Sequence, residues 1–169
     1  MTAQVPERLF YAGETLPLFG NPLFGYLEQH AKFDLFQSTC TANWRGYVGS
    51  WAITEERLYL TNLVGRLRDG TPADLQTVFP ESMGSVFADW YSGSLRVPQG
   101  KLLDYVHLGY ASRYERDLLI EIHAGCVLST TVRGEFLAGG DSPAQESCSE
   151  MAGTRPGLVK RLSSILSRS

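Results

Sequence analysis

The sequence of 169 residues has few cysteines, few lysines and no long apolar run. Its three cysteines, Cys40, Cys126 and Cys148, lie far apart and form no CxxC pair, which argues against a zinc ribbon, a dithiol redox motif or a disulfide framework. No apolar run approaches the roughly 20 residues that span a bilayer, so we expect no membrane span. The net charge of -3 gives no basic field, so we expect no nucleic-acid partner.

The chain also lacks the short motifs of the best-known enzyme classes. It contains no GxxxxGKS phosphate loop, no GxGxxG, no GxSxG nucleophile elbow and no HExxH zinc motif. These absences exclude common nucleotide-binding, hydrolase and metalloprotease signatures, but not enzymes that lack a local motif. His107 and His123 with Asp104 or Glu121 are the available metal ligands, and their spacing matches no known site. We therefore expect neither a cofactor nor a metal.

Length and composition indicate one folded domain followed by a tail. Hydrophobic residues make up 43% of the chain and aromatic residues 11%, which suits a packed core. We expect a globular domain over residues 1–137, a linker or loop rich in Gly, Ser, Pro and acids over 138–156, and a short basic amphipathic helix over 157–169. Residues 1–10 contain charges and no continuous apolar segment, unlike a signal peptide, so a cytoplasmic location is expected.

Alternating apolar residues predict β-hairpins in the middle of the chain. Residues 44–63 alternate on both sides of a polar turn at 54–57, which should place Trp51 on the same core face as Leu58 or Leu60. Pro98 has no N–H for a ladder, so its strand should end there or lie at a sheet edge. Further strands are expected over residues 86–91, 95–97, 118–123 and 127–132, with turns at 92–93 and 124–125 and a charged loop over 113–117.

Short helices are expected beside these hairpins. Asn21 is a good N-cap and Pro22 suits the first helical position, which predicts a helix ending near residues 30–32. Residues 72–79 carry apolar side chains at helical spacing and precede Pro80. No helix of crossover length separates the hairpins. The predicted fold class is α+β, with a mainly antiparallel β-sheet built from hairpins and short flanking helices. A small β-barrel or sandwich is the alternative.

Five residues form a hypothetical catalytic set. If residues 104–110 are helical, Asp104 and His107 share a face, and the carboxylate could orient the imidazole as a base. Asp89 and Tyr110 could complete a polar pocket, and Cys40 becomes a nucleophile if a base lies beside it. The structural alternative is that the histidine is simply a hydrogen-bonded residue in a tyrosine-rich segment.

A second set of residues suits recognition rather than catalysis. Trp90 and Tyr91 follow an acid and precede a glycine turn, where they could form a binding wall or pack across strands. Arg113, Tyr114 and Arg116 lie in a run of alternating charge that could recognise an anion or a partner protein, or remain a solvated loop. Aromatic and arginine side chains are the residue types that protein interfaces use as anchors.

Four short segments carry a family resemblance. Trp44-Arg45-Gly46-Tyr47, residues 87–93, residues 97–101 and residues 114–118 together resemble small stand-alone bacterial proteins of uncharacterised activity. The resemblance covers residues 10–135, and it implies no activity, cofactor or catalytic residue. Gly49-Ser50-Trp51 also has the GxW form of lipocalin-type barrels, although the rest of the chain lacks their evenly spaced strands.

These observations favour a non-catalytic cytosolic protein-binding module over an enzyme. The specific form that we consider is an immunity protein that neutralises a bacterial toxin, with Trp90, Tyr91, Arg113, Tyr114 and Arg116 as the binding residues. One alternative is a small-ligand-binding protein, or an enzyme without a local motif, that uses the Asp/His/Tyr pocket. The other is a structural oligomer, of which a homodimer joined by a sheet edge or by the tail is the simplest form.

Overall fold

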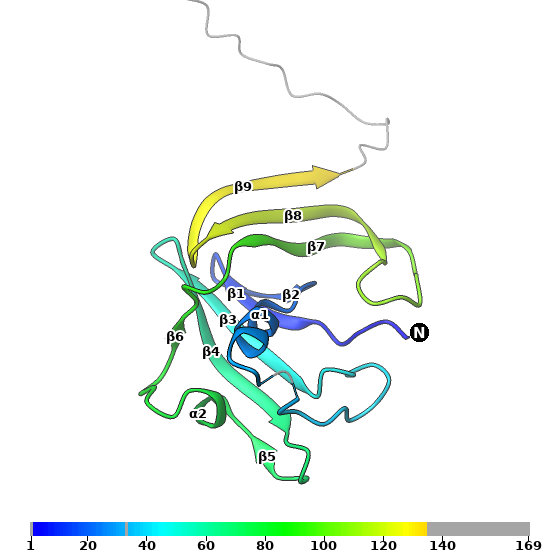
Figure 1. Cartoon of the computed structure of the whole chain (residues 1–169). Coiled ribbons are helices and arrows are strands. Elements are labelled where there is room, and N and C mark those ends of the chain that lie inside the picture. The colour runs from blue at the N-terminus through cyan, green and yellow to red at the C-terminus, as the bar shows by residue number, and fades with distance from the viewer. Residues whose placement is uncertain (1, 33, 135–169) are drawn as a thin grey trace, which may run out of the picture. The chain divides into compact units, whose positions relative to one another are not determined.

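The computed structural model describes residues 2–32 and 34–134, so the segments expected over 138–156 and 157–169 lie outside the described residues. The described chain forms nine strands and two helices (Figure 1). In chain order they are β1 (Glu7–Tyr11), β2 (Glu14–Leu18), α1 (Pro22–Gln29), β3 (Tyr47–Thr54), β4 (Arg57–Arg66), β5 (Pro72–Ala73), α2 (Leu75–Val78), β6 (Val86–Phe87), β7 (Gly93–Asp104), β8 (Arg113–His123) and β9 (Cys126–Gly134).

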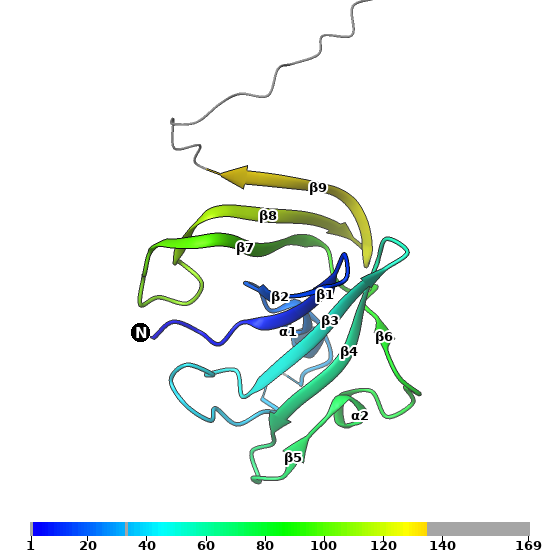
Figure 2. The same ribbon diagram turned by 180° about the vertical axis from the view of Figure 1, so that it is seen from behind.

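All of these strands belong to one mixed sheet in which most pairs are antiparallel. The order is β2-β1-β3-β4-β9-β8-β7, and β5 and β6 also pair with β4. The prediction of a mainly antiparallel sheet is confirmed. The exception is the parallel pair of β1 and β3, which arises because β2 returns the chain to the end of the sheet where β1 begins, and β3 starts from that same end. Figures 1 and 2 show β7, β8 and β9 as one layer, with β1, β3 and β4 crossing beneath it.

The two hairpins with the clearest sequence alternation form as expected. β3 and β4 are joined at Glu55 and Glu56, whose φ angles of 50° and 57° are those of a tight turn that matches the twist of the strands. Trp51 and Leu58 are buried on the core face, as the alternation predicts. β8 and β9 are joined at residues 124–125, again with positive φ at both positions.

Helix α1 begins where the Asn-Pro pair predicts and lies against one face of β1 and β3 (Figures 1 and 2). Proline at its first position loses no intrahelical hydrogen bond. Asn21 precedes the helix but makes no side-chain capping bond. Leu23 and Leu27 are completely or almost completely buried, and each burial stabilises the fold by about 1.5–3 kcal/mol. The helix is therefore held by packing more than by its cap.

Three expected elements differ in the structure. The strand expected over residues 86–91 stops at Phe87, and the chain turns before it enters β7. The helix expected over 72–79 is reduced to α2, which begins at a capping box between Asp74 and Thr77. The charged run over 113–117 is not a loop but the first half of β8, because its backbone pairs with both β7 and β9. Pro98 lies within β7, which is the edge strand of the path, so the edge alternative is the correct one.

The first 20 residues, which show no clean period, form the hairpin of β1 and β2. Its turn is Ala12-Gly13, with positive φ at both residues. Leu9 and Leu18 are completely buried, but Glu7 is completely buried too, and this acid interrupts the apolar alternation of the strand. The hairpin was not predicted because one of its core positions carries a charged side chain.

Gly46 offers a test of how tightly the loop before β3 is packed. Its φ is +78°, and a Cβ there would overlap the Gln37 carbonyl group, whose carbon would lie 2.7 Å away. We predict that Gly46→Ala lowers the free energy of unfolding by about 2–5 kcal/mol, because backbone strain adds to the overlap. Urea unfolding measures the loss. Gly20→Ala, where a Cβ meets open space, should change it by less than about 0.5 kcal/mol. Equal midpoints for the two variants would contradict the prediction.

Candidate functional site

A hollow of about 720 Å³ opens between three segments that are distant in the sequence. We call it the Trp44 pocket. Its walls come from residues 2–4, from residues 38–44 and from residues 108–109. Trp44 and Leu108 are large apolar side chains with exposed fractions of 55% and 47%, so they present hydrophobic surface to solvent. The remaining lining is hydroxyl groups, an amide, a glycine and the thiol of Cys40, and none of the described lining residues is charged.

The N-terminal segment lies between the other two walls and binds both. The Gln4 N–H donates to Gly109 O at 3.0 Å, and the Val5 N–H donates to Ala42 O at 2.8 Å. The Gln4 side chain donates from Nε2 to Thr41 O at 2.9 Å and accepts from the Trp44 N–H at 3.3 Å. One short stretch of chain therefore fixes the separation of the two loops that form the pocket.

A tight turn shapes the loop that carries Cys40 and Trp44. The Asn43 N–H donates to Cys40 O at 2.9 Å, and Asn43 Nδ2 lies 3.4 Å from the Thr39 hydroxyl. The following Gly46 N–H donates to Asn43 O at 3.2 Å. These bonds fold residues 39–46 back on themselves, which places the Cys40 thiol and the Trp44 indole on the same pocket.

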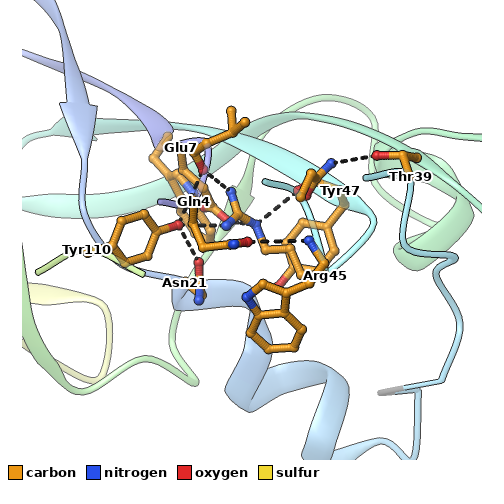
Figure 3. Close-up of polar contacts among 11 residues, drawn as sticks. Gln4, Glu7, Asn21, Thr39, Arg45, Tyr47 and Tyr110 are labelled. Carbon is orange, nitrogen blue, oxygen red and sulfur yellow. Dashed lines mark hydrogen bonds and ion pairs between the residues drawn. The ribbon is translucent and has the colours of Figure 1, made fainter. Parts of the chain in front are cut away.

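A buried arginine lies behind the pocket (Figure 3). Arg45 is 6% exposed, and its guanidinium donates to Tyr47 O at 3.0 Å, to Val5 O at 2.7 Å and to the Tyr110 hydroxyl at 2.6 Å. The Tyr110 hydroxyl in turn donates to Asn21 Oδ1 at 2.9 Å. The Arg45 Nε lies 3.5 Å from a carboxylate oxygen of Glu7. We call these residues the Glu7–Arg45 network.

The network and the pocket use neighbouring residues of the same three segments. Gln4 lines the pocket while Val5 accepts from the guanidinium, and Trp44 lines it while Arg45 supplies that guanidinium. In the third segment, Gly109 lines the pocket and the neighbouring Tyr110 accepts a hydrogen bond from the guanidinium. Hydrogen bonds to charged groups stabilise by about 1.5–3 kcal/mol each. The buried cation therefore holds together the segments that form the pocket walls.

Glu7 is the counter-charge of Arg45, and its side chain is shielded from solvent. The side chain is completely buried, and burial raises its pKa to about 7, although Arg45, the Trp51 indole N–H and the Gly49 N–H all favour the ionised form. Trp51 Nε1 donates to one carboxylate oxygen. A Cβ at Gly49 would lie 2.8 Å from that same oxygen, so only glycine leaves room for the carboxylate.

Two tyrosines beside the network also titrate abnormally. Burial, with the nearby Glu7 charge, raises the pKa of Tyr47, whose hydroxyl has no hydrogen-bond partner among the described residues. Burial likewise raises the pKa of Tyr110, although Arg45 partly opposes the change. Both hydroxyls therefore stay protonated at neutral pH, and the ionisable charges of the network are those of Glu7 and Arg45.

The structure separates the hypothetical catalytic residues. Residues 104–110 are not helical: Asp104 ends β7 opposite Arg113, and His107 lies in the following loop with its ring edge-on to Tyr105. Asp89 is exposed in the turn after β6. Of the five residues, Cys40 lines the Trp44 pocket, Tyr110 belongs to the Glu7–Arg45 network behind it, and the three others line neither.

The pocket therefore lacks the groups that would activate the thiol. Cys40 is exposed, but the described residues that line the pocket include no histidine, acid or lysine. A thiol needs an adjacent base or cation to become a strong nucleophile near neutral pH. In the described part of the chain, no group of three or more His, Cys, Asp and Glu side chains is placed to hold a metal ion.

Two of the five residues expected to bind a partner are engaged in the fold. The Trp90 ring packs against Tyr26 and Phe79, with centroids 4.8 and 5.4 Å away, and its indole N–H donates to Pro22 O at 3.1 Å. Tyr91 is half-buried against the core. Burial raises its pKa to about 12.

The other three residues lie on β8. Tyr114 is half-buried with its ring edge-on to Phe19, whereas Arg113 and Arg116 are exposed. Sequence reasoning assigned no role to Gln4, Glu7, Arg45 or Leu108. The one available signal was Trp44-Arg45, an aromatic residue beside an arginine in a segment singled out only for resemblance.

Because Glu7 is buried, the stability of the fold should depend on pH. Its carboxyl binds a proton more tightly in the folded chain, with a pKa of about 7 against 4.5 when unfolded. The folded state therefore holds the extra proton between these values, and the free energy of unfolding falls as pH rises through this window. We predict a fall of about 2 kcal/mol between pH 5 and pH 7.5, measured by urea unfolding.

Two matched variants test whether the pH dependence of the free energy of unfolding comes from the Glu7 carboxyl. Glu7→Gln cannot titrate and should remove most of the slope, whereas Glu14→Gln changes an exposed acid in β2 and should keep it. A slope that persists in Glu7→Gln would show that another group is responsible.

The three segments around Trp44 and the ion pair behind them define the candidate site. Its described lining is uncharged, a buried guanidinium links the three segments next to the lining residues, and its exposed side chains include those of Trp44 and Cys40. Among the described residues, neither helix is long and apolar enough to cross a bilayer. A comparison with protein-family models, with curated proteins and with solved structures finds no match for this chain.

Proposed function

We propose that this chain is a non-catalytic binding domain of the cytoplasm, and that its ligand is a small, uncharged, partly apolar molecule held in the Trp44 pocket. The supporting observation is the pocket itself, a hollow of about 720 Å³ with an exposed indole and an exposed leucine on its walls. Small-molecule sites commonly enclose about 300–1,000 Å³ and combine apolar walls with a few polar groups.

The charge distribution supports an uncharged ligand. The pocket walls offer hydroxyl groups and a glycine backbone but no ionised side chain, so a charged ligand would lose its hydration without gaining a counter-ion. The Arg45 cation does not line the pocket: it is buried and already faces the carboxylate of Glu7. The flat face of Trp44 suits an aromatic or planar group.

A specific observation also favours a second candidate, the protein-binding module. Leu102, Leu103 and Tyr105 have exposed fractions of 46%, 45% and 53% at the end of β7 and the start of its loop, and the same loop carries Leu108 into the pocket wall. Several exposed apolar side chains close together in the sequence are a feature that protein interfaces use. An immunity protein that neutralises a bacterial toxin would use such a surface, and this function remains our second proposal.

The ligand proposal is tested with the uncharged fluorophore prodan. We predict saturable binding to the wild-type chain, seen as a blue shift of prodan emission, and at least about tenfold weaker binding to Leu108→Asp, because a carboxylate then enters an apolar wall. A trimethylammonium derivative of the same fluorophore should bind more weakly than prodan to the wild-type chain.

Met83→Asp is the matched control, because it places the same charge on a fully exposed apolar residue outside the pocket. It should bind prodan as the wild-type chain does. Equal loss in both variants, or no binding to the wild-type chain, would reject the pocket as a small-molecule site.

The protein-binding candidate predicts a different pattern of loss. Leu102→Asp with Leu103→Asp removes apolar surface outside the pocket lining, so this variant should still bind prodan but lose the partner. A protein recovered from native lysate with the wild-type chain and with Met83→Asp, and lost with the double variant, would then be purified and its affinity measured by calorimetry. If all three chains recover the same proteins, this surface is not the interface.

A further inference from the structure

Strand β9 leaves one edge of the sheet open. It pairs with β8 from Cys126 to Gly134, but on its other side it meets β4 only at the pair of Arg57 and Cys126. The last bond on that side joins the Val127 N–H to Glu56 O at 2.7 Å. Past this point, no described residue pairs with the outer edge. Figure 1 shows β9 as the outermost strand of its layer.

The open stretch is unusually permissive for a sheet edge. Residues 128–132 read Leu-Ser-Thr-Thr-Val, with no charge, proline or glycine, and all five are exposed. Natural proteins commonly protect edges with lysine, proline or a bulge, because free N–H and C=O groups recruit another strand. Leu128 and Val132 are apolar yet have exposed fractions of 69% and 55%. Among residues 2–32 and 34–134, none pairs with the outer side of this stretch beyond Val127.

We propose that a second copy of this chain pairs with β9 antiparallel, with Thr130 of each copy on the two-fold axis. The sequence of the edge is complementary to itself in that register. Leu128 of each copy then lies opposite Val132 of the other, and Ser129 lies opposite Thr131. Directly opposed apolar pairs and hydroxyl pairs are favourable across antiparallel strands, at about 0.2–1 kcal/mol each.

The register also continues the buried face of the sheet. Val132 is paired with Leu118 and Thr130 with Ile120 on β8, and both of these β8 side chains are buried in the core. Paired residues share a face, so the exposed Val132 lies on the core side of the sheet; Leu128 lies at a register shift between the partners of Glu121 and Ile122. Pairing through β9 would join the layers of β7, β8 and β9 from two copies into one continuous layer of six strands.

Charge favours the antiparallel arrangement over the parallel one. In the antiparallel register, Arg133 of one copy lies opposite Val127 of the other, beside the turn at Glu55 and Glu56. No ion pair engages Arg133 or these two acids within the described part of the chain. An in-register parallel pair would instead bring the two Arg133 side chains together, which is unfavourable.

The interface is short, so the dimer should dissociate on dilution, as small interfaces do. The test uses sedimentation velocity of the full chain over a range of concentrations. Thr130→Lys and Thr130→Glu each place like charges opposite one another on the two-fold axis, and each variant should raise the dissociation constant at least about tenfold. An equimolar mixture of the two variants should restore the dimer, because the opposed charges are then complementary.

Thr71→Lys adds the same charge to an exposed threonine in a loop and should leave the association unchanged. Circular dichroism checks that each variant folds. A chain that stays monomeric up to millimolar concentration overturns the proposal. So does a dimer that both Thr130 variants leave intact, since its interface must then lie elsewhere. Failure of the mixture to associate, with each variant folded, would exclude the two-fold register at Thr130.

Discussion

The buried contact between Glu7 and Arg45 is the constraint on which the described structure most depends. It joins β1 to the segment before β3, and the guanidinium also binds Val5 and Tyr110, so residues more than 100 positions apart meet at one group. Two charges out of water are costly, and removing one partner of such a pair typically costs about 3–5 kcal/mol. The remaining hydrogen bonds of Arg45, and the Trp51 indole on Glu7, offset only part of the lost hydration, since burial still raises the pKa of Glu7 to about 7.

This arrangement separates charge from the binding surface. The ionised groups lie behind the Trp44 pocket, and the described side chains that line it are neutral. The buried Arg45 cation binds three of the surrounding oxygens and lies against Glu7, so it links the segments that form the walls without being part of the pocket lining. The pocket is therefore rigid where its backbone is anchored, whereas Trp44 and Leu108 are exposed and free to contact a ligand. These properties are the ones on which the proposed binding of a neutral ligand rests.

Burial distinguishes the aromatic residues that pack in the fold from the one that is exposed at the pocket. Trp90, Tyr26 and Phe79 stack against one another at the side of α1, and Trp51 is sealed in the core, so these rings stabilise the fold. Trp44 has the same chemistry but lies at a loop turn, where more than half of its surface is accessible. The open edge of β9 is a second exposed feature, and it offers backbone groups rather than a hollow.

Local patterns in the sequence determined the hairpins of β3–β4 and β8–β9 and the start of α1. Period-two alternation, tight turns and an Asn-Pro pair act over a few residues and need no distant partner. The β1–β2 hairpin and the strand over residues 113–117 were decided by tertiary structure. From sequence alone, a charged residue is expected to face solvent, and only the fold shows which partner it packs against. Glu7 is buried only because Arg45 lies beside it, and Asn21 accepts from Tyr110 instead of capping its helix. The pocket likewise exists only where three separated segments converge, which no local pattern encodes.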